Sequence, residues 1–165
     1  MPSIGVQASA AILGLARDLR TALDQRCAPL GLTSQQAGLL IHVFTGLNTG
    51  KQLAEALGTD SAGITRLLDR LEAKGYVRRS PDPTDRRAQE ISLTHVGQAL
   101  IPDLPGLFED VAATMLRDVD AGRVYLDTST MLDNLRAAGQ RPAAASSTSS
   151  PEQSRRPQSA RRRTP

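Results

Sequence analysis

The stretch that most limits the fold of this chain runs from Thr59 to Leu93 and combines one amphipathic helix with a basic hairpin. In its first half, aliphatic side chains recur at i, i+3, i+4 and i+7, a spacing that places them on one face of a helix. These residues are Ile64, Leu67, Leu68 and Leu71. Asp60 is a good N-cap residue before this run, and Gly75 is a good stop after it. We therefore predict a helix over residues 60–74.

Two short strands are predicted after this helix. Residues 76–79 begin the first strand, and the apolar residues of 90–93 alternate with polar ones in the returning strand. Residues 80–87 between them hold two prolines and two aspartates, which suits a turn. A short amphipathic helix, K-Q-L-A-E-A-L at 51–57, precedes the unit, with Thr49 placed to cap it. Helix, turn, helix, strand, charged loop and strand is the order of a winged helix-turn-helix.

A resemblance to a known family appears in three consecutive runs, QLAEALGTDSAGITRLLDRLEAKGYVRR, DPTDRR and ISLTHVG. In this order and spacing they resemble the MarR family of bacterial transcription regulators, over about residues 30–100. The specific features are Thr65-Arg66, Leu71-Glu72, Lys74-Gly75, Asp85-Arg86-Arg87, Leu93-Thr94 and Gly97. The resemblance implies a mainly α fold with a small two-stranded β-wing, in which a winged helix-turn-helix is joined to a helical dimerisation region.

Helical periodicity continues on both sides of this unit. Ile12, Leu15, Leu19 and Leu23 predict a first helix. Thr33 and Gln36 form the capping-box pattern at the start of a second one. Pro102 and Pro105 lie inside a later apolar run and predict a kink between them, because each proline removes a backbone donor. A last helix is expected over residues 120–139.

We expect one domain over residues 1–139. Its DNA-binding lobe would cover about residues 33–97, and its dimerisation helices about residues 5–28 and 95–138. Residues 140–165 hold six arginines, one glutamate and no apolar periodicity, so this segment is expected to be a disordered tail. The tail either adds salt-sensitive, non-specific DNA affinity or has no role in binding.

Charge is distributed unevenly along the chain. The net charge is +3, yet residues 140–165 carry +5, so the rest of the chain is mildly acidic. Within that acidic body, residues 66–87 carry seven basic and four acidic groups. A basic region on an acidic body is the electrostatic footprint of a nucleic-acid-binding protein. No apolar run approaches a membrane span and no signal-peptide pattern is present, so we expect a cytoplasmic protein. The resemblance implies a bacterial protein that associates with the nucleoid by binding DNA.

The expected partner is double-stranded DNA. The candidate DNA-binding residues are Ser61, Ala62, Thr65, Arg66, Arg70, Arg78, Arg86 and Arg87. Short polar and small side chains in the first half of a recognition helix can reach base edges, phosphates or a thymine methyl, and Arg66 can reach a guanine edge or a phosphate. Gly63 would let the backbone approach DNA closely. Arg86 and Arg87 at the wing tip would enter the minor groove. The alternative is that Ser61 and Thr65 only cap the helix and that Arg66 is a solvated charge.

Two further roles are assigned to charged residues near the wing. Asp85 is expected to pair with Arg66 or Arg78 and so to fix the wing against the helix. Arg78 and Arg79 are expected to divide phosphate contact and wing support between them. The competing hypothesis, from another functional class, is a protein-interaction module that keeps the winged fold but no longer binds DNA.

Family resemblance also implies a homodimer that binds a pseudo-palindromic operator, acts as a repressor and is released by a small aromatic or phenolic anion. Weak candidates for binding that effector are Arg17, Arg20 and His42, as polar groups on helices. A redox-sensing alternative rests on Cys27, the single cysteine, whose pKa the neighbouring Arg26 would lower. We expect no enzyme activity, no metal site and no cofactor, since neither histidine lies near a cluster with metal-ligand spacing.

Overall fold

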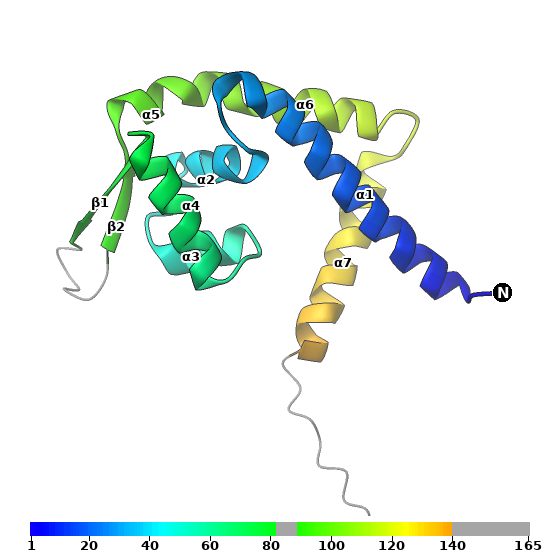
Figure 1. The fold of residues 1–165 in the computed structure, drawn as a ribbon. Coiled ribbons are helices and arrows are strands. Elements are labelled where there is room, and N and C mark those ends of the chain that lie inside the picture. Colours follow the sequence, from blue (N-terminus) through cyan, green and yellow to red (C-terminus); the bar gives the residue numbers. More distant parts are fainter. Residues whose placement is uncertain (82–88, 140–165) are drawn as a thin grey trace, which may run out of the picture. The chain divides into compact units, whose positions relative to one another are not determined.

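A computed structural model of the chain describes residues 1–81 and 89–139 (Figure 1). The chain divides into two compact units, Met1–Val119 and Asp120–Pro165. The first unit contains α1 (Ile4–Cys27), the 3₁₀ turn η1 (Ala28–Leu30), α2 (Ser34–Phe44), α3 (Gly50–Ala56), α4 (Ser61–Ala73), β1 (Val77–Pro81), β2 (Gln89–Leu93), α5 (His95–Leu100), the 3₁₀ turn η2 (Ile101–Asp103) and α6 (Leu104–Met115). The second unit contains α7 (Ala121–Gly139). The predicted fold class is confirmed: the chain is mainly α-helical with a two-stranded antiparallel wing.

Side-chain caps fix where α2, α3 and α4 begin. Thr33 and Gln36 form the predicted capping box, with the Gln36 amide 3.3 Å from Thr33 Oγ1 and the Thr33 amide 3.1 Å from Gln36 Oε1. Thr49 caps α3 in a second box with Gln52. Asp60 caps α4 by accepting a 2.6 Å hydrogen bond from the Gly63 amide. These bonds satisfy backbone donors that have no partner inside their own helix.

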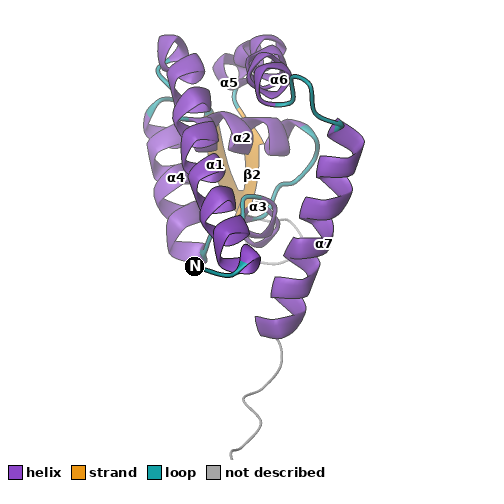
Figure 2. Cartoon of the chain, turned by 90° about the vertical axis from the view of Figure 1, so that its right-hand side faces the viewer, coloured by secondary structure: helices purple, strands orange, loops and turns teal. Residues whose placement is uncertain are grey.

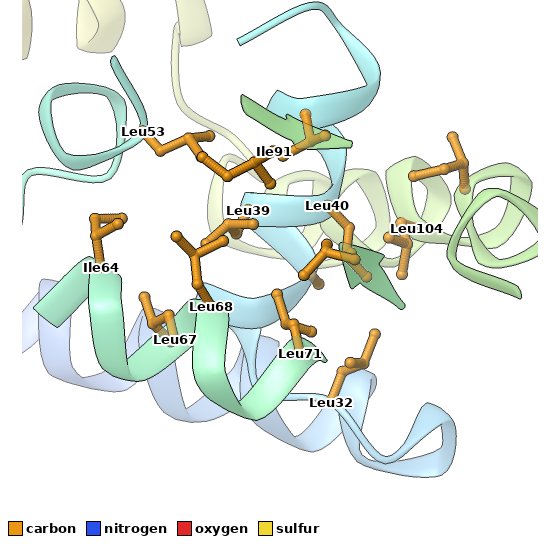
Figure 3. Packing of buried hydrophobic residues seen from close by; sticks show 14 of the residues in the cluster. Leu32, Leu39, Leu40, Leu53, Ile64, Leu67, Leu68, Leu71, Ile91 and Leu104 are labelled. Atoms are coloured by element: carbon orange, nitrogen blue, oxygen red, sulfur yellow. The ribbon is translucent and has the colours of Figure 1, made fainter. Parts of the chain in front are cut away.

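The apolar stripe of α4 packs into the core of the lobe. Ile64, Leu67, Leu68 and Leu71 are all buried, as their spacing predicts. Figure 3 shows this stripe facing α2 and α3, where Leu39 and Leu53 are fully buried. Burying one leucine side chain stabilises a fold by about 1.5–3 kcal/mol. The core therefore holds α4 in one rotational setting and leaves its opposite face to solvent.

The wing is attached to the helix-turn-helix through the loop before α3. β1 and β2 pair antiparallel, with Val77 opposite Leu93 and Arg79 opposite Ile91. The Ile91 amide donates to the carbonyl oxygen of Asn48 at 2.8 Å, and Asn48 Nδ2 donates to Glu90 Oε1 at 3.1 Å. α2, near the centre of the lobe in Figure 2, also contacts β2. The base of the wing is thus part of the lobe and not a free hairpin.

A tight backbone contact joins the end of α4 to the start of α5. Gly75 ends α4 with a positive φ of 71°, a conformation that glycine adopts without strain. The Thr94 amide then donates to the Tyr76 carbonyl at 3.0 Å. A Cβ atom on Gly97 would overlap that same carbonyl oxygen. The short L-T-x-x-G pattern after the wing therefore meets a steric requirement at this junction.

The predicted break between α5 and α6 is present. α5 ends at Leu100, η2 contains Pro102, and α6 begins with Pro105 in its first turn. Beyond the break, α6 packs along α1. In the described ranges, 1–81 and 89–139, no helix is long and apolar enough to cross a membrane.

Candidate nucleic-acid interface

The exposed face of α4 carries all five of the residues predicted there. Ser61, Ala62, Thr65, Arg66 and Arg70 are exposed to solvent. The core fixes this result, since the buried stripe of α4 leaves only the other side of the helix accessible. Small and hydroxyl side chains lie in the first half of α4, and the arginines follow along the helix. A helix with this distribution presents short groups where a groove floor is nearest and long cations where phosphates lie.

The hydroxyl of Thr65 is partly engaged within the helix. Thr65 Oγ1 donates a 2.9 Å hydrogen bond to the carbonyl oxygen of Ser61. This bond orients the side chain and uses its only proton. The hydroxyl oxygen keeps its acceptor capacity, so Thr65 can accept a hydrogen bond from a base amino group.

Gly63 has a steric role in the turn that precedes α4. A Cβ atom at Gly63 would overlap Thr59 Oγ1 and lie close to Asp60 Oδ1, the oxygen that caps α4. The space beside Gly63 is therefore filled by the turn that precedes α4. The glycine makes room for the cap, and the close approach of DNA to its backbone stays a prediction.

Of the two arginines at the base of the wing, one has the supporting role that was predicted for the pair. Arg79 supports the wing: its side chain is 19% exposed and lies 2.6 Å from Asp69 Oδ1. Arg78 is exposed on the other side of β1, where its Nε donates to Ser92 Oγ at 3.0 Å. The expected pairing of Asp85 and the two wing-tip candidates, Arg86 and Arg87, fall outside the described residues.

A recess separates α3, α4 and the wing. Its volume is about 690 Å³, and its lining residues are Gly50, Lys51, Ala54, Ser61, Ile64, Thr65, Leu68, Arg79, Pro81, Gln89 and Ile91. It therefore has polar groups from all three elements around an aliphatic floor. The helix-turn-helix and the wing are thus two sides of one continuous surface.

Free positive charge is available on this surface. Within residues 1–81 and 89–139, no carboxylate forms an ion pair with Arg66, Arg70 or Arg78. Apart from the Nε of Arg78, which donates to Ser92, their donors have no hydrogen-bond partner among the described residues, and a guanidinium matches the geometry of a phosphate or a guanine edge. Among the described residues, no ion pair of these three arginines would have to break before this face receives a polyanion.

Of the three candidates for effector binding, the structure brings two together. Arg20 and His42 line a recess of about 350 Å³ between α1 and α2, together with Leu19, Leu57 and Phe108. Arg17 is not part of it, and its Nε donates instead to Asp18 Oδ1 at 3.0 Å. In the part of the chain that the structure describes, no group of three or more His, Cys, Asp or Glu side chains gathers as a metal site.

Cys27 does not have the environment predicted for a redox sensor. Its side chain is completely buried at the end of α1. Burial raises the pKa of the Cys27 thiol, and the nearby carboxylate of Asp24 raises it further. Arg26 does not lower it, because the guanidinium of Arg26 forms an ion pair with Asp110. The expectation of an activated thiolate is therefore wrong, since reactive cysteines are accessible and have a lowered pKa.

Comparisons with known proteins point to one family. A family model described as MarR family matches residues 30–88. Among solved structures, the transcriptional regulator MosR of M. tuberculosis in complex with DNA is 28% identical, with a TM-score of 0.69 over 83% of this chain and 98% of that one. A mutant of MarR from E. coli complexed with operator DNA is 25% identical, with a TM-score of 0.65 over 82% and 95%. The regulator BldR from Sulfolobus solfataricus shares the fold, with 24% identity and a TM-score of 0.70 over 81% and 99%.

Proposed function

We propose that the chain is a homodimeric MarR-type repressor of a pseudo-palindromic operator, because a MarR family model matches residues 30–88 and two regulators crystallised with DNA share its fold. In this proposal α4 enters the major groove, and two copies read half-sites about 10 bp apart. A small aromatic or phenolic anion releases the dimer from DNA. The observation that carries the proposal is the exposed face of α4, where hydroxyl and guanidinium groups lie opposite a buried aliphatic stripe.

DNA as the partner is supported by the charge and by the relatives. Arg66, Arg70 and Arg78 are exposed cations on a chain whose residues before 140 are acidic in total. The E. coli relative was crystallised with operator DNA, and the M. tuberculosis relative with DNA. Repression would follow from occupancy of the operator, which blocks access of polymerase to the same DNA.

The homodimer is supported by apolar side chains that have no cover within their own units. On α1, Ile4, Val6, Ile12, Leu13 and Leu15 are exposed. On α7, Tyr125, Leu126, Met131, Leu132 and Leu135 are exposed. Several large exposed apolar side chains on one helix are typical of an interaction site. We assign both helices to the dimer interface, together with α5 and α6 as parts of the same predicted helical region.

Release by an effector is supported by the recess that holds Arg20 and His42. Its volume of about 350 Å³ lies within the range of small-molecule sites, and its walls are largely aliphatic and aromatic. Arg20 supplies a cation for a carboxylate or phenolate, while Leu57 and Phe108 supply apolar walls. The recess involves both α1 and α2, so an occupant that prefers one setting of these helices would shift the population of DNA-competent dimers.

The contact made by α4 is tested by replacing Arg66 with alanine. We expect affinity for the preferred DNA site to fall by about 1–3 kcal/mol and selectivity to relax at one base pair, as for loss of a bidentate base contact. Arg117→Ala removes the same charge from an exposed position after α6 and should leave affinity nearly unchanged. Equal losses in both variants would show that α4 contributes only net charge.

The effector site is tested separately with Arg20→Gln. We expect salicylate to release the wild-type protein from DNA, and the variant to need a concentration about tenfold higher because it has lost a cationic partner for the carboxylate. Arg17→Gln is the matched control, as Arg17 lies outside the recess. An unchanged response in Arg20→Gln would remove this recess from the proposal.

A further inference from the structure

Arg79 differs from the other basic side chains around α4. Its side chain is only 19% exposed, whereas Arg66 and Arg78 are open to solvent. It extends from β1 toward α4 instead of outward. A cation withdrawn in this way from a surface that binds a polyanion needs an explanation other than phosphate contact.

Among the described residues, the side chain of Arg79 makes its polar contacts with α4. Its Nη2 lies 2.6 Å from Asp69 Oδ1 and 3.4 Å from the carbonyl oxygen of Thr65. Its Nε lies 3.7 Å from Glu72 Oε2, and its backbone amide donates to Glu72 Oε1 at 3.3 Å. Residues 65, 69 and 72 are spaced by four and three positions, so they lie along one face of α4. One arginine thus spans two turns of the recognition helix.

The charge of Arg79 is offset where it lies. Two carboxylates, those of Asp69 and Glu72, approach the guanidinium within 4 Å. Little of the cation's field then remains for a phosphate. Nη2 makes both side-chain hydrogen bonds, while Nε approaches Glu72 without a hydrogen-bond partner among the described residues. A lysine has one ammonium nitrogen and cannot occupy both positions at once.

We propose that Arg79 is a positioning residue that ties β1 to the exposed side of α4, so that the wing and the recognition helix present DNA with one fixed relative orientation. Asn48 anchors the other strand by accepting from the Ile91 amide and donating to Glu90. The two strands of the wing are therefore held from two sides, Arg79 on β1 and Asn48 on β2. The expected effect on DNA affinity rests on the proposed function, whereas the contact between β1 and α4 does not.

The variant Asp69→Asn distinguishes a positioning role of Arg79 from a purely electrostatic one, because the two predict opposite changes in DNA affinity. Removing a negative charge from the DNA-facing side would tighten binding if charge alone mattered. Under the proposal the charge-assisted bond to Arg79 is weakened, and affinity for the preferred site falls by about tenfold. Glu55→Gln on α3 removes the same charge from an exposed residue and is the matched control. Tighter binding by Asp69→Asn would overturn the proposal.

Arg79→Lys separates positioning from direct phosphate contact. Lysine keeps the charge and would retain most of the affinity if Arg79 touched a phosphate. Under the proposal it does not rescue binding, and its loss is within about threefold of the loss in Arg79→Gln. Near wild-type binding by the lysine variant would contradict the positioning role. The thermal midpoint of each variant is measured alongside, so that global unfolding is recognised.

Amide hydrogen exchange tests the same contact without DNA. We expect exchange in β1 to accelerate by about tenfold in Asp69→Asn and in Arg79→Lys, while α1 amides serve as the internal reference and do not change. Unchanged β1 exchange in both variants would refute the proposal whether or not the protein binds DNA. Failure of the wild-type protein to bind any DNA, with faster β1 exchange in the variants, would remove the proposed function and leave the positioning contact standing.

Discussion

At the scale of single residues, exposure and chemistry on α4 follow from one periodicity. Four aliphatic side chains are buried on one side, so the hydroxyl and guanidinium groups between them are turned outward. This outcome is predictable from sequence because both faces belong to one helix. The role of Arg79 is less predictable, since its partners Asp69 and Glu72 lie on a different element and meet it only when β1 packs against α4.

Cys27 also shows that neighbours in sequence do not reveal contacts between distant elements. Its neighbour in sequence, Arg26, suggested an activated thiol, but Arg26 pairs with Asp110, 84 positions later in the chain. Burial at the end of α1 then sets the chemistry of the cysteine. Local sequence reports neighbours along the chain, whereas a pKa depends on neighbours in space.

The reactivity of Cys27 gives a direct prediction at this scale. The folded protein should react with Ellman's reagent at neutral pH far more slowly than the unfolded chain, because its thiol is buried and protonated. Since the chain has one cysteine, the absorbance reports this site alone. Rapid stoichiometric labelling of the folded protein would contradict the burial described here.

The direction of the pKa shift also predicts a pH dependence. The fold favours the protonated thiol of Cys27, so this contribution to stability is complete below the ordinary thiol pKa and is lost as the pH rises through the raised value. A Cys27→Ala variant should therefore lose less stability than the wild type between neutral and alkaline pH. Urea unfolding at several pH values measures this difference, and parallel curves for the two proteins would argue against it.

At the scale of elements, the caps and breaks were the most predictable features. The Thr33–Gln36 capping box, the cap at Thr49 and the proline break before α6 each depend on a few adjacent residues. The steric role of Gly97 was not predictable, because the atom it must avoid belongs to Tyr76. Of the three effector candidates, only Arg20 on α1 and His42 on α2 line the same recess. The spacing of residues within either helix does not reveal that the two side chains lie close together.

Gly97 and Gly106 should respond oppositely to the same substitution. Gly97→Ala places a methyl group into the Tyr76 carbonyl, and we expect it to reduce the free energy of unfolding by about 1–3 kcal/mol. Gly106→Ala has no atom nearby and lies within α6, where alanine is favoured by up to about 1 kcal/mol. Chemical denaturation measures both. A neutral Gly97→Ala would mean that the α4–β1–α5 junction is less tightly packed than described.

At the scale of the whole molecule, the proposed binding to two half-sites requires a second copy of the chain. Leu13 is 72% exposed on α1, so a charge there should not disturb the monomer but should disrupt a dimer that buries this helix. We expect Leu13→Glu to sediment as a monomer at concentrations where the wild type is dimeric. Phe44→Glu at the exposed end of α2 is the control and should remain dimeric. A monomeric wild type would remove the paired half-site arrangement.

The central claim is specific recognition of DNA, and fluorescence anisotropy tests it most directly. The full chain is used to enrich sites from a random DNA pool, and the enriched site is then titrated beside a scrambled duplex of equal length across a salt series. We predict two half-sites about 10 bp apart and a preference of about 10³ or more at moderate salt, with affinity falling as salt rises. Failure to enrich any sequence, or equal affinity for both duplexes at every salt concentration, would contradict the account.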